Sequence, residues 1–306
     1  MNTITIQLAQ WLGRDDARLR DAYHPVVYSR AFLWSEILIA DTRPIAEADI
    51  RAAHARGLRG IVRPGVGYDN VPLALCRDLG ITCAYTPHAP SESVAELTLG
   101  LMIVATRGVF PSSRALVAGR WERSLGRNLS KLTVGIVGLG RIGKRVAAMI
   151  APLCARVLAF DPYCPDTTFD AIHHLERVDE LGVLLAQSDI VTLHVPRTAK
   201  TMGMIGAAEL AVMRPEGVLI NTARGGIVDE AALLVHLVAH PEFVACLDVF
   251  AEEPYRGPLG GLPNCLPTPH LGAMTRESRE RMEREAVDAA LAICDGRPPR
   301  WRIPEE

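Results

Sequence analysis

The sequence is poor in several features that mark particular classes of protein. Phe, Trp and Tyr make up only 5% of its 306 residues, and the formal net charge at pH 7 is -2. A charge balance of this kind gives no general attraction to nucleic acid or to an anionic membrane. No apolar run reaches the roughly 18 residues of a membrane-spanning helix, and even Leu97–Thr106 is too short. The N-terminal residues lack the basic start and apolar core of a signal peptide.

The seven cysteines also lack a pattern, because they include no C-x-x-C pair and no metal-ligand spacing. Their odd number and scatter are typical of reduced thiols. We therefore predict a soluble, cytoplasmic protein with no metal site and with neither nucleic acid nor membrane as a partner. What the sequence does contain is a large share of apolar residues, 49%, and a length sufficient for two domains.

A short apolar run, Val134–Val137, leads directly into a glycine-rich turn. The turn places Gly138, Gly140 and Gly143 in the spacing G-x-G-x-x-G, and residues 141–153 then carry apolar side chains at helical intervals. In such a turn the first glycine permits the tight bend, the second lets the backbone approach a pyrophosphate, and the third lets the helix pack closely on the sheet. Phosphates would lie at the helix N-terminus, where free N–H groups and the helix dipole favour negative charge.

A second predicted strand, residues 156–160, ends at Asp161, about 20 residues beyond the glycines. An acid at this place accepts hydrogen bonds from the adenosine ribose hydroxyls and repels a 2′-phosphate, which favours NAD over NADP. A glycine turn that binds nothing would not explain why strand, turn, helix, second strand and acid follow in this order. The sequence therefore predicts an NAD-binding domain of the Rossmann type.

Apolar runs and helix-like segments alternate on both sides of this motif, as in a parallel α/β fold. The predicted strands are residues 4–9, 26–29, 36–40, 60–62, 189–195, 217–223 and 244–250. The predicted helices are residues 46–56, 71–79, 229–239 and 275–294, together with an apolar, buried helix that a capping box at Ser93–Glu96 would begin. Residues 108–131 are more polar and are expected to form an extended arm.

Three charged residues follow predicted strands in the second half of the chain: Arg224 after INTA, Glu253 after DVF, and His270 within TPHLG. Ligands of open parallel sheets bind at the carboxyl ends of the strands, so we expect all three to face the cleft of the glycine turn. The set suits hydride transfer to a 2-keto acid. Arg224 can clamp the carboxylate, His270 can donate a proton to the carbonyl oxygen, and Glu253 can hold the imidazole.

Taken singly, each of these three residues also has an ordinary structural explanation, as a surface charge, a turn residue or a loop histidine. Their combination with the glycine motif favours the catalytic interpretation. A second glycine turn, Arg63–Asn70, can expose backbone N–H groups that suit a carboxylate. An ordinary strand-to-helix turn without a ligand is equally consistent with that segment.

The motifs GLGRIG, HVPRTAKTMGMI, INTARGGIVDE, LDVFAEEP and TPHLGA occur in order and at the expected spacing. Together with RPGVGYDN and SESVAELTLGLM, they make the chain resemble the D-isomer-specific 2-hydroxyacid dehydrogenase family from Ile61 to Gly272, whereas residues 1–60 match only loosely. The resemblance implies a Rossmann-type NAD-binding domain, residues 97–280, inserted in a smaller flavodoxin-like α/β substrate domain formed by residues 1–96 and 281–306. It also implies a homodimer with the region 93–130 at the interface.

The resemblance also implies which residues form the site. Arg224, Glu253 and His270 would be catalytic, and the substrate would contact Arg63, Val66, Gly67 and Arg224. The implied cofactor contacts are Gly138, Gly140, Arg141, Ile142, Gly143, Asp161, Pro162, His194, Val195, Pro196, Thr222, Ala223, Asp248, His270 and Gly272. His88 departs from the family, in which small residues or acids are more usual at this position.

The implied activity is NAD-dependent interconversion of a small D-2-hydroxy acid and its 2-keto acid, with 3-phosphoglycerate, glycerate/hydroxypyruvate or glycolate/glyoxylate as candidates. Arg63 could meet a substrate phosphate, which slightly favours the first. The alternative is an NAD(H)-sensing binding protein similar to the C-terminal-binding-protein corepressors, which keep the same three residues. Against it, the chain ends soon after its last helix and shows no evident peptide-docking surface. Formate or phosphite oxidation is disfavoured by the apolar Val66 and by a carboxylate at Glu253.

Overall fold

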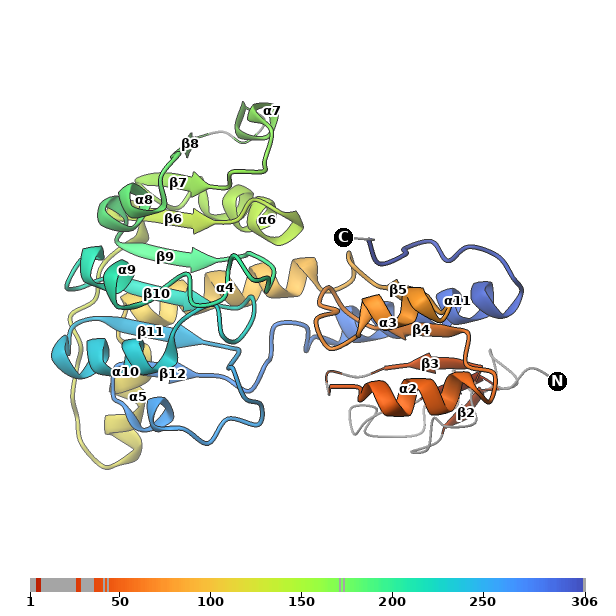
Figure 1. The fold of residues 1–306 in the computed structure, drawn as a ribbon. Coiled ribbons are helices and arrows are strands. Elements are labelled where there is room, and N and C mark those ends of the chain that lie inside the picture. The colour runs from red at the N-terminus through yellow and green to blue at the C-terminus, as the bar shows by residue number, and fades with distance from the viewer. Residues whose placement is uncertain are drawn as a thin grey trace. The chain divides into compact units, whose positions relative to one another are not determined.

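The computed structural model describes residues 4–6, 26–28, 36–40, 42, 44–170, 172 and 174–304. The chain divides into two compact units, one formed by residues 1–90 and 275–306 and the other by residues 91–274 (Figure 1). The boundaries expected from the resemblance lie a few residues further along the chain. The parts of the first two predicted strands that follow Ile6 and Tyr28 lie outside the described residues.

In the smaller unit the described residues form a parallel sheet with the strand order β2-β1-β3-β4-β5. The strands are β1 (Ile4–Ile6), β2 (Val26–Tyr28), β3 (Ile37–Ile39), β4 (Gly60–Arg63) and β5 (Thr82–Tyr85), and the helices are α2 (Glu47–His54), α3 (Leu73–Asp78) and α11 (Arg276–Cys294). The order 2-1-3-4-5 is that of flavodoxin-like folds, which confirms the expected fold class.

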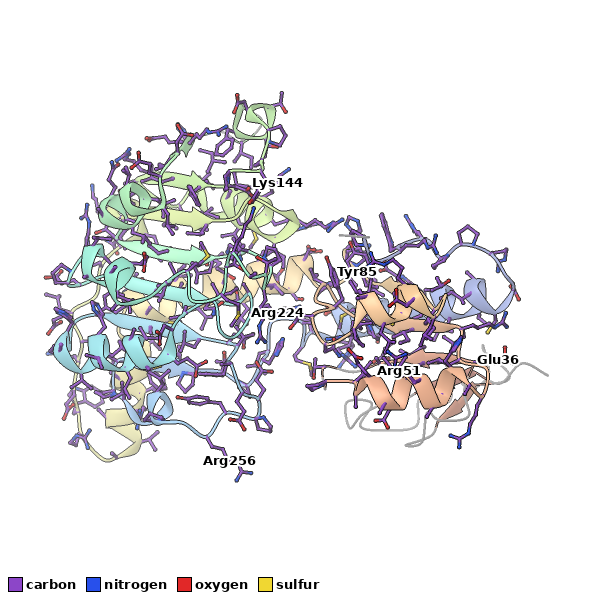
Figure 2. All side chains as sticks on the ribbon, in the orientation of Figure 1. Glu36, Arg51, Tyr85, Lys144, Arg224 and Arg256 are labelled. Carbon is purple, nitrogen blue, oxygen red and sulfur yellow. The ribbon has the colours of Figure 1, made fainter. Side chains whose placement is uncertain are left out.

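Both faces of this sheet are covered by helices. Ile37 and Ile39 of β3 pack with the buried side of α11, whereas Leu38 between them packs with residues of α2 and α3, as the period of two along a strand requires. At the start of β3, Glu36 pairs with Arg59 at 2.7 Å (Figure 2). Helix α11, from the other end of the sequence, therefore completes the core of the smaller unit.

In the larger unit the described residues form a parallel sheet with the order β12-β11-β10-β9-β6-β7-β8. Its strands are β6 (Thr133–Val137), β7 (Arg156–Phe160), β8 (Leu175–Arg177), β9 (Ile190–Leu193), β10 (Val218–Asn221), β11 (Val244–Leu247) and β12 (Cys265–Pro267). Counted from β6, this is the Rossmann order 3-2-1-4-5-6 with one further strand.

Helices bury both faces of this sheet as well. One core contains residues of α4 (Ser91–Thr106) and α6 (Arg141–Ile150), and the other contains residues of α8 (Leu181–Gln187), α9 (Ala207–Val212) and α10 (Glu230–Ala239). Strands buried on both faces read as continuous apolar runs, which is why they were visible in the sequence. The short helix α7 (Asp166–Asp170) lies between β7 and β8 along the chain.

Three details of the sequence prediction are wrong. The strand predicted over residues 217–223 ends at Asn221, because the Asn221 side chain accepts the Ala223 N–H at 3.0 Å and donates to the Arg224 carbonyl at 2.9 Å. Helix α4 begins at Ser91, so the capping box predicted at Ser93 does not start it. The expected extended arm contains α5 (Val109–Val117) and a short 3-10 helix at Leu129–Lys131.

Among the described residues, no single helix is long and apolar enough to cross a membrane. Helices α4 and α5 reach that length and apolarity only when they are taken together, and they are bent by 68° at the break between them. All seven cysteines, each of which the structure describes, are free thiols.

Candidate active site

The glycine turn joins β6 to α6, and its three glycines differ in what surrounds them. Gly138 has a φ of +96°, and a Cβ on it would lie 2.6 Å from the His194 carbonyl oxygen. A Cβ on Gly143 would lie 2.0 Å from the Gly138 carbonyl oxygen. Around Gly140, by contrast, no described atom lies within 4 Å of that position. The fold itself therefore requires Gly138 and Gly143, while Gly140 leaves open space at the end of a helix.

That helix, α6, begins without a side-chain cap on its first N–H groups. Uncapped amides at a helix N-terminus bind anions through their N–H groups and the helix dipole. The open space at Gly140 and these amides together fit the pyrophosphate of a dinucleotide.

The carboxylate of Asp161 lies beside this turn, at the end of β7. Its Oδ2 accepts the Leu139 N–H at 2.8 Å, and its Oδ1 accepts the Tyr163 N–H at 2.9 Å. An ionised carboxylate can accept about four hydrogen bonds, so two backbone amides fix its orientation and leave room for hydroxyl donors. Asp161 therefore fits the ribose contact that the sequence predicts.

The loop after β9 supplies the opposite side of the turn. Burial lowers the pKa of His194 to about 3, so its ring is neutral, and its Nε2 lies 3.0 Å from the Thr192 hydroxyl. Its backbone N–H donates to the Val137 carbonyl of β6 at 2.7 Å. Thr222, after β10, is buried and shares a 3.0 Å hydrogen bond with Thr98 of α4. His194 and Thr222 therefore lie at the carboxyl ends of β9 and β10, on the side of β6 opposite to β7.

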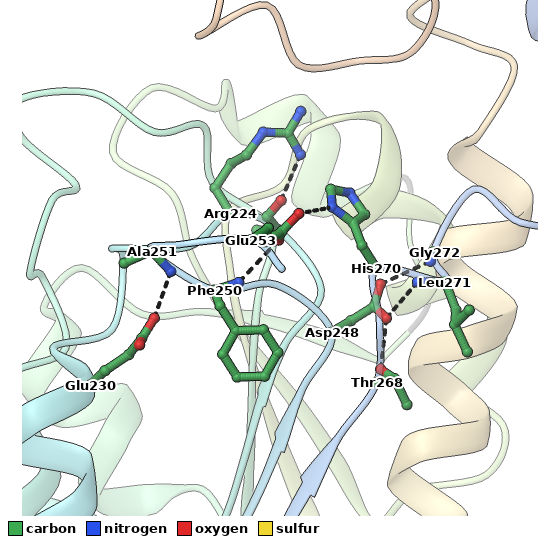
Figure 3. Close-up of polar contacts among 11 residues, drawn as sticks. Arg224, Glu230, Asp248, Phe250, Ala251, Glu253, Thr268, His270, Leu271 and Gly272 are labelled. Carbon is green, nitrogen blue, oxygen red and sulfur yellow. Dashed lines mark hydrogen bonds and ion pairs between the residues drawn. The ribbon is translucent and has the colours of Figure 1, made fainter. Parts of the chain in front are cut away.

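Arg224, Glu253 and His270 come from the loops that follow β10, β11 and β12, and the structure brings them together. The Glu253 carboxylate lies between the other two side chains (Figure 3). Its Oε2 is 2.8 Å from Nδ1 of His270, and its Oε1 accepts the Phe250 N–H at 3.1 Å. Arg224 donates from Nη1 to the Ala223 carbonyl at 2.6 Å. Because a carboxylate only accepts, Nδ1 carries the proton and Nε2 is left for chemistry.

The charge state of Glu253 follows from these contacts. Burial by itself would raise its pKa, but the His270 hydrogen bond and charge, the Phe250 N–H and the nearby Arg224 lower the pKa below its usual value. A carboxylate with a lowered folded-state pKa contributes stability above its unfolded-state pKa, and that contribution is lost as the pH falls through the folded-state value. Glu253 is therefore ionised at neutral pH beside the imidazole.

His270 has a left-handed backbone, with φ of +56°, which is unusual for a residue other than glycine. Asp248 holds the loop in this form. Its Oδ1 accepts from the Thr268 hydroxyl at 2.6 Å and the Leu271 N–H at 2.7 Å, and its Oδ2 accepts from the Gly272 N–H at 2.8 Å. Strained residues persist only where their surroundings over-determine them, and they concentrate at functional sites. Asp248 thus organises the histidine loop, a role that the sequence did not reveal.

Burial raises the pKa of Asp248, although its hydrogen bonds to Thr268, Leu271 and Gly272 act in the opposite direction. The predicted contact of Asp248 with the cofactor therefore involves a carboxylate that already accepts three hydrogen bonds within the protein.

The remaining predicted substrate residues belong to the smaller unit, in the turn after β4. Gly65 has a φ of +123°, and its N–H donates to the Thr86 hydroxyl at 2.6 Å. Among the described residues, none accepts a hydrogen bond from the N–H groups of Val66 or Gly67. These two amides fit the predicted carboxylate-binding turn.

Arg63 itself is 9% exposed, donates from Nε to Asn70 Oδ1 at 3.3 Å and contacts the Pro64 carbonyl. Its guanidinium therefore helps to shape this turn. Nearby, the ring of His88 packs on Trp301 with a centroid distance of 4.6 Å. The described residues contain no group of three or more His, Cys, Asp or Glu side chains that could hold a metal ion.

Comparison with known proteins gives consistent results. Residues 99–272 match the family model described as D-isomer specific 2-hydroxyacid dehydrogenase, NAD binding domain. A hydroxypyruvate reductase of Thermotoga maritima is 36% identical over 259 residues, which cover 83% of each chain. A D-3-phosphoglycerate dehydrogenase of Methanocaldococcus jannaschii is 39% identical over 229 residues, 74% of this chain and 44% of that protein. The chain thus spans about half the length of the phosphoglycerate dehydrogenases it matches.

Among solved structures, a D-lactate dehydrogenase from Aquifex aeolicus, complexed with NAD and lactic acid, superposes with a TM-score of 0.84 at 26% identity and covers 96% of both chains.

Proposed function

The chain belongs to the D-isomer-specific 2-hydroxyacid dehydrogenase family, and on that premise we propose that it interconverts a small D-2-hydroxy acid and the corresponding 2-keto acid with NAD. The observation that carries this proposal is the 2.8 Å contact between His270 and Glu253 at the sheet edge that also carries the glycine turn. This contact supports the proposal because folds of this kind bind a dinucleotide at the carboxyl ends of their strands, where a proton donor would meet the substrate.

The cofactor would be held by the groups that fit it best. Gly138, Gly140 and Gly143, with the amides of Arg141 and Ile142, would receive the pyrophosphate, and Asp161 with Pro162 would receive the adenosine ribose. The remaining cofactor contacts that we propose are His194, Val195, Pro196, Thr222, Ala223, Asp248, His270 and Gly272. When bound, NADH supplies the hydride that reduces the keto carbon.

The protein's own side chains would bind the substrate and transfer the proton. The guanidinium of Arg224 would hold the substrate carboxylate through two parallel hydrogen bonds. Nε2 of His270 would donate a proton to the carbonyl oxygen during reduction and accept it back during oxidation. Glu253 would keep the imidazole in position by accepting the hydrogen bond from Nδ1 of His270. In the smaller unit, the amides of Val66 and Gly67 would be available to a substrate carboxylate.

The substrate we favour is an unphosphorylated acid of the glycerate/hydroxypyruvate size. The Arg63 guanidinium, the predicted contact for a phosphate, is buried in its own turn and donates to Asn70. A panel of hydroxypyruvate, glyoxylate, pyruvate and 3-phosphohydroxypyruvate, compared by kcat/KM with NADH, tests both the reaction and this preference. Failure to oxidise NADH with any 2-keto acid of a broad panel would overturn the proposed reaction.

Replacing Arg224 with alanine is expected to lower kcat/KM for the keto acid by about 100-fold, since charge-assisted hydrogen bonds contribute about 1.5–3 kcal/mol. Arg224→Lys should recover only part of this, because an ammonium cannot form the planar fork. The Kd for NADH, measured by fluorescence titration, should stay unchanged. The matched control is Arg256→Ala, whose side chain points outward at the edge of the same unit (Figure 2). Equal losses in both variants would contradict the role of Arg224.

We also propose that the protein is a homodimer through the region 93–130. Large apolar side chains there are well exposed in the single chain: Val117 at 88%, Trp121 at 82% and Leu125 at 102%. Exposed apolar patches of this kind mark protein–protein interfaces.

Sedimentation velocity should show a dimer for the wild type and a monomer for the double variant Trp121→Asp, Leu125→Asp. Val235 and Val238 on α10 are similarly exposed and lie outside the region. Their replacement by aspartate should leave the dimer intact, and a monomeric wild type at micromolar concentration would refute the proposal.

A further inference from the structure

The segment that carries Glu253 has little main-chain support. Among the described residues, residues 250–255 take part in no backbone-to-backbone hydrogen bond. The stacked rings of Phe250 and Tyr255, 4.0 Å apart, hold the two ends of the segment together. Something else has to define where Glu253 lies relative to His270.

Two carboxylates supply the missing hydrogen bonds (Figure 3). Glu253 itself accepts the Phe250 N–H at 3.1 Å, which is a bond within the segment. Glu230 accepts the next amide, the Ala251 N–H, through Oε1 at 2.6 Å. Among the described residues, Glu230 is therefore the only one outside the segment that hydrogen-bonds to its main chain.

Glu230 is well placed for this task and is not needed to cap its helix. It is the first residue of α10, but the helix is capped by its neighbour Asp229, whose side chain accepts the N–H groups of Ala231 and Ala232 at 3.0 Å. The loop that precedes α10 also carries Arg224. In this loop, Gly225 lies so close to residues 250–255 that a Cβ on it would be 1.8 Å from the Phe250 carbonyl oxygen.

We propose that Glu230 is a positioning residue for the reaction proposed above: by anchoring the Ala251 amide it sets the place of Glu253, and through Glu253 the orientation of His270. The expected loss of activity rests on the proposed function. The expected change in the position of Glu253 and His270 rests on the contacts alone. It links the Arg224 loop and the Glu253 loop, which are distant in sequence, into one unit.

The test compares three substitutions. Glu230→Ala removes the acceptor, Glu230→Asp keeps the negative charge at the helix N-terminus but is one methylene too short to reach, and Glu230→Gln retains an acceptor oxygen. We expect the alanine and aspartate variants to lose roughly 10- to 100-fold in kcat for keto-acid reduction, with the Kd for NADH unchanged. The glutamine variant should retain the wild-type kcat, because it keeps an acceptor for the Ala251 N–H.

The matched control is Glu242→Ala, an exposed glutamate beyond the other end of α10, which should behave as the wild type. A separate readout does not depend on turnover: the Nδ1–H proton of His270, hydrogen-bonded to Glu253, should give a downfield NMR signal in the wild type and Glu230→Gln but not in Glu230→Asp. An active wild type whose kcat and NMR signal persist in Glu230→Asp would overturn the inference and leave the proposed reaction standing. An inactive wild type in which the signal still depends on Glu230 would overturn only the reaction.

Discussion

Replacing His270 with alanine is expected to slow keto-acid reduction by about 10²- to 10⁴-fold, the usual contribution of a positioned general acid. The imidazole is the group that Glu253 holds at 2.8 Å, and its loop is locked in a left-handed form by Asp248. The loss should appear in kcat, measured from NADH absorbance at saturating keto acid. NADH binding should remain measurable, because the glycine turn and Asp161 are untouched.

The matched control for this experiment is His240→Ala, at the exposed C-terminal end of α10. This variant should keep the wild-type rate. A His270→Ala protein that turns over at a rate close to that of the wild type would show that the proton comes from another group, and loss of NADH binding would show that the loop has a structural role instead.

Alanine substitutions in the glycine turn are expected to separate folding from cofactor binding. In Gly143→Ala the new Cβ would lie 2.0 Å from the Gly138 carbonyl, so α6 must move away from the turn. We expect a loss of about 1–3 kcal/mol in the free energy of unfolding, as is usual for overpacking, together with loss of NADH binding.

In Gly140→Ala no described atom lies within 4 Å of the new Cβ, so stability should be retained. NADH affinity should nevertheless fall about tenfold or more, because the methyl group occupies the approach to the pyrophosphate.

Urea unfolding and NADH fluorescence titration measure the two effects separately. The control is Gly182→Ala in α8, where a Cβ likewise meets nothing within 4 Å, so the NADH affinity should keep its wild-type value and the free energy of unfolding should not fall. Wild-type NADH affinity in Gly140→Ala would refute the proposed place of the pyrophosphate.

Much of the fold could be read from the sequence because both sheets are buried on both faces. Each buried strand then appears as an apolar run, and the runs at β6, β9, β10 and β11 were all predicted. Their ends were less predictable. The run at residues 217–223 stays apolar or small to Ala223, yet the strand stops at Asn221, because an amide side chain captures a backbone N–H that the sheet would otherwise use.

Helix α5 was missed for a related reason. Its sequence, VFPSSRALV, contains a proline and two serines, which are poor helix formers, so local preference indicated an irregular arm. Proline is tolerated in the first turn of a helix, where its missing N–H has no partner to lose.

The sequence by itself determined the class of fold, and it indicated the glycine turn, Asp161 and the three residues Arg224, Glu253 and His270 as the candidate site. Those residues stand at strand ends, and the spacing of glycines and apolar runs is a local property of the chain. Only the tertiary structure decided that Glu253 meets His270, that Asp248 locks the histidine loop, that Arg63 turns inward and that Glu230 anchors Ala251. Each of these contacts involves at least one residue of a loop without regular structure, where no periodicity along the sequence records which atoms come together.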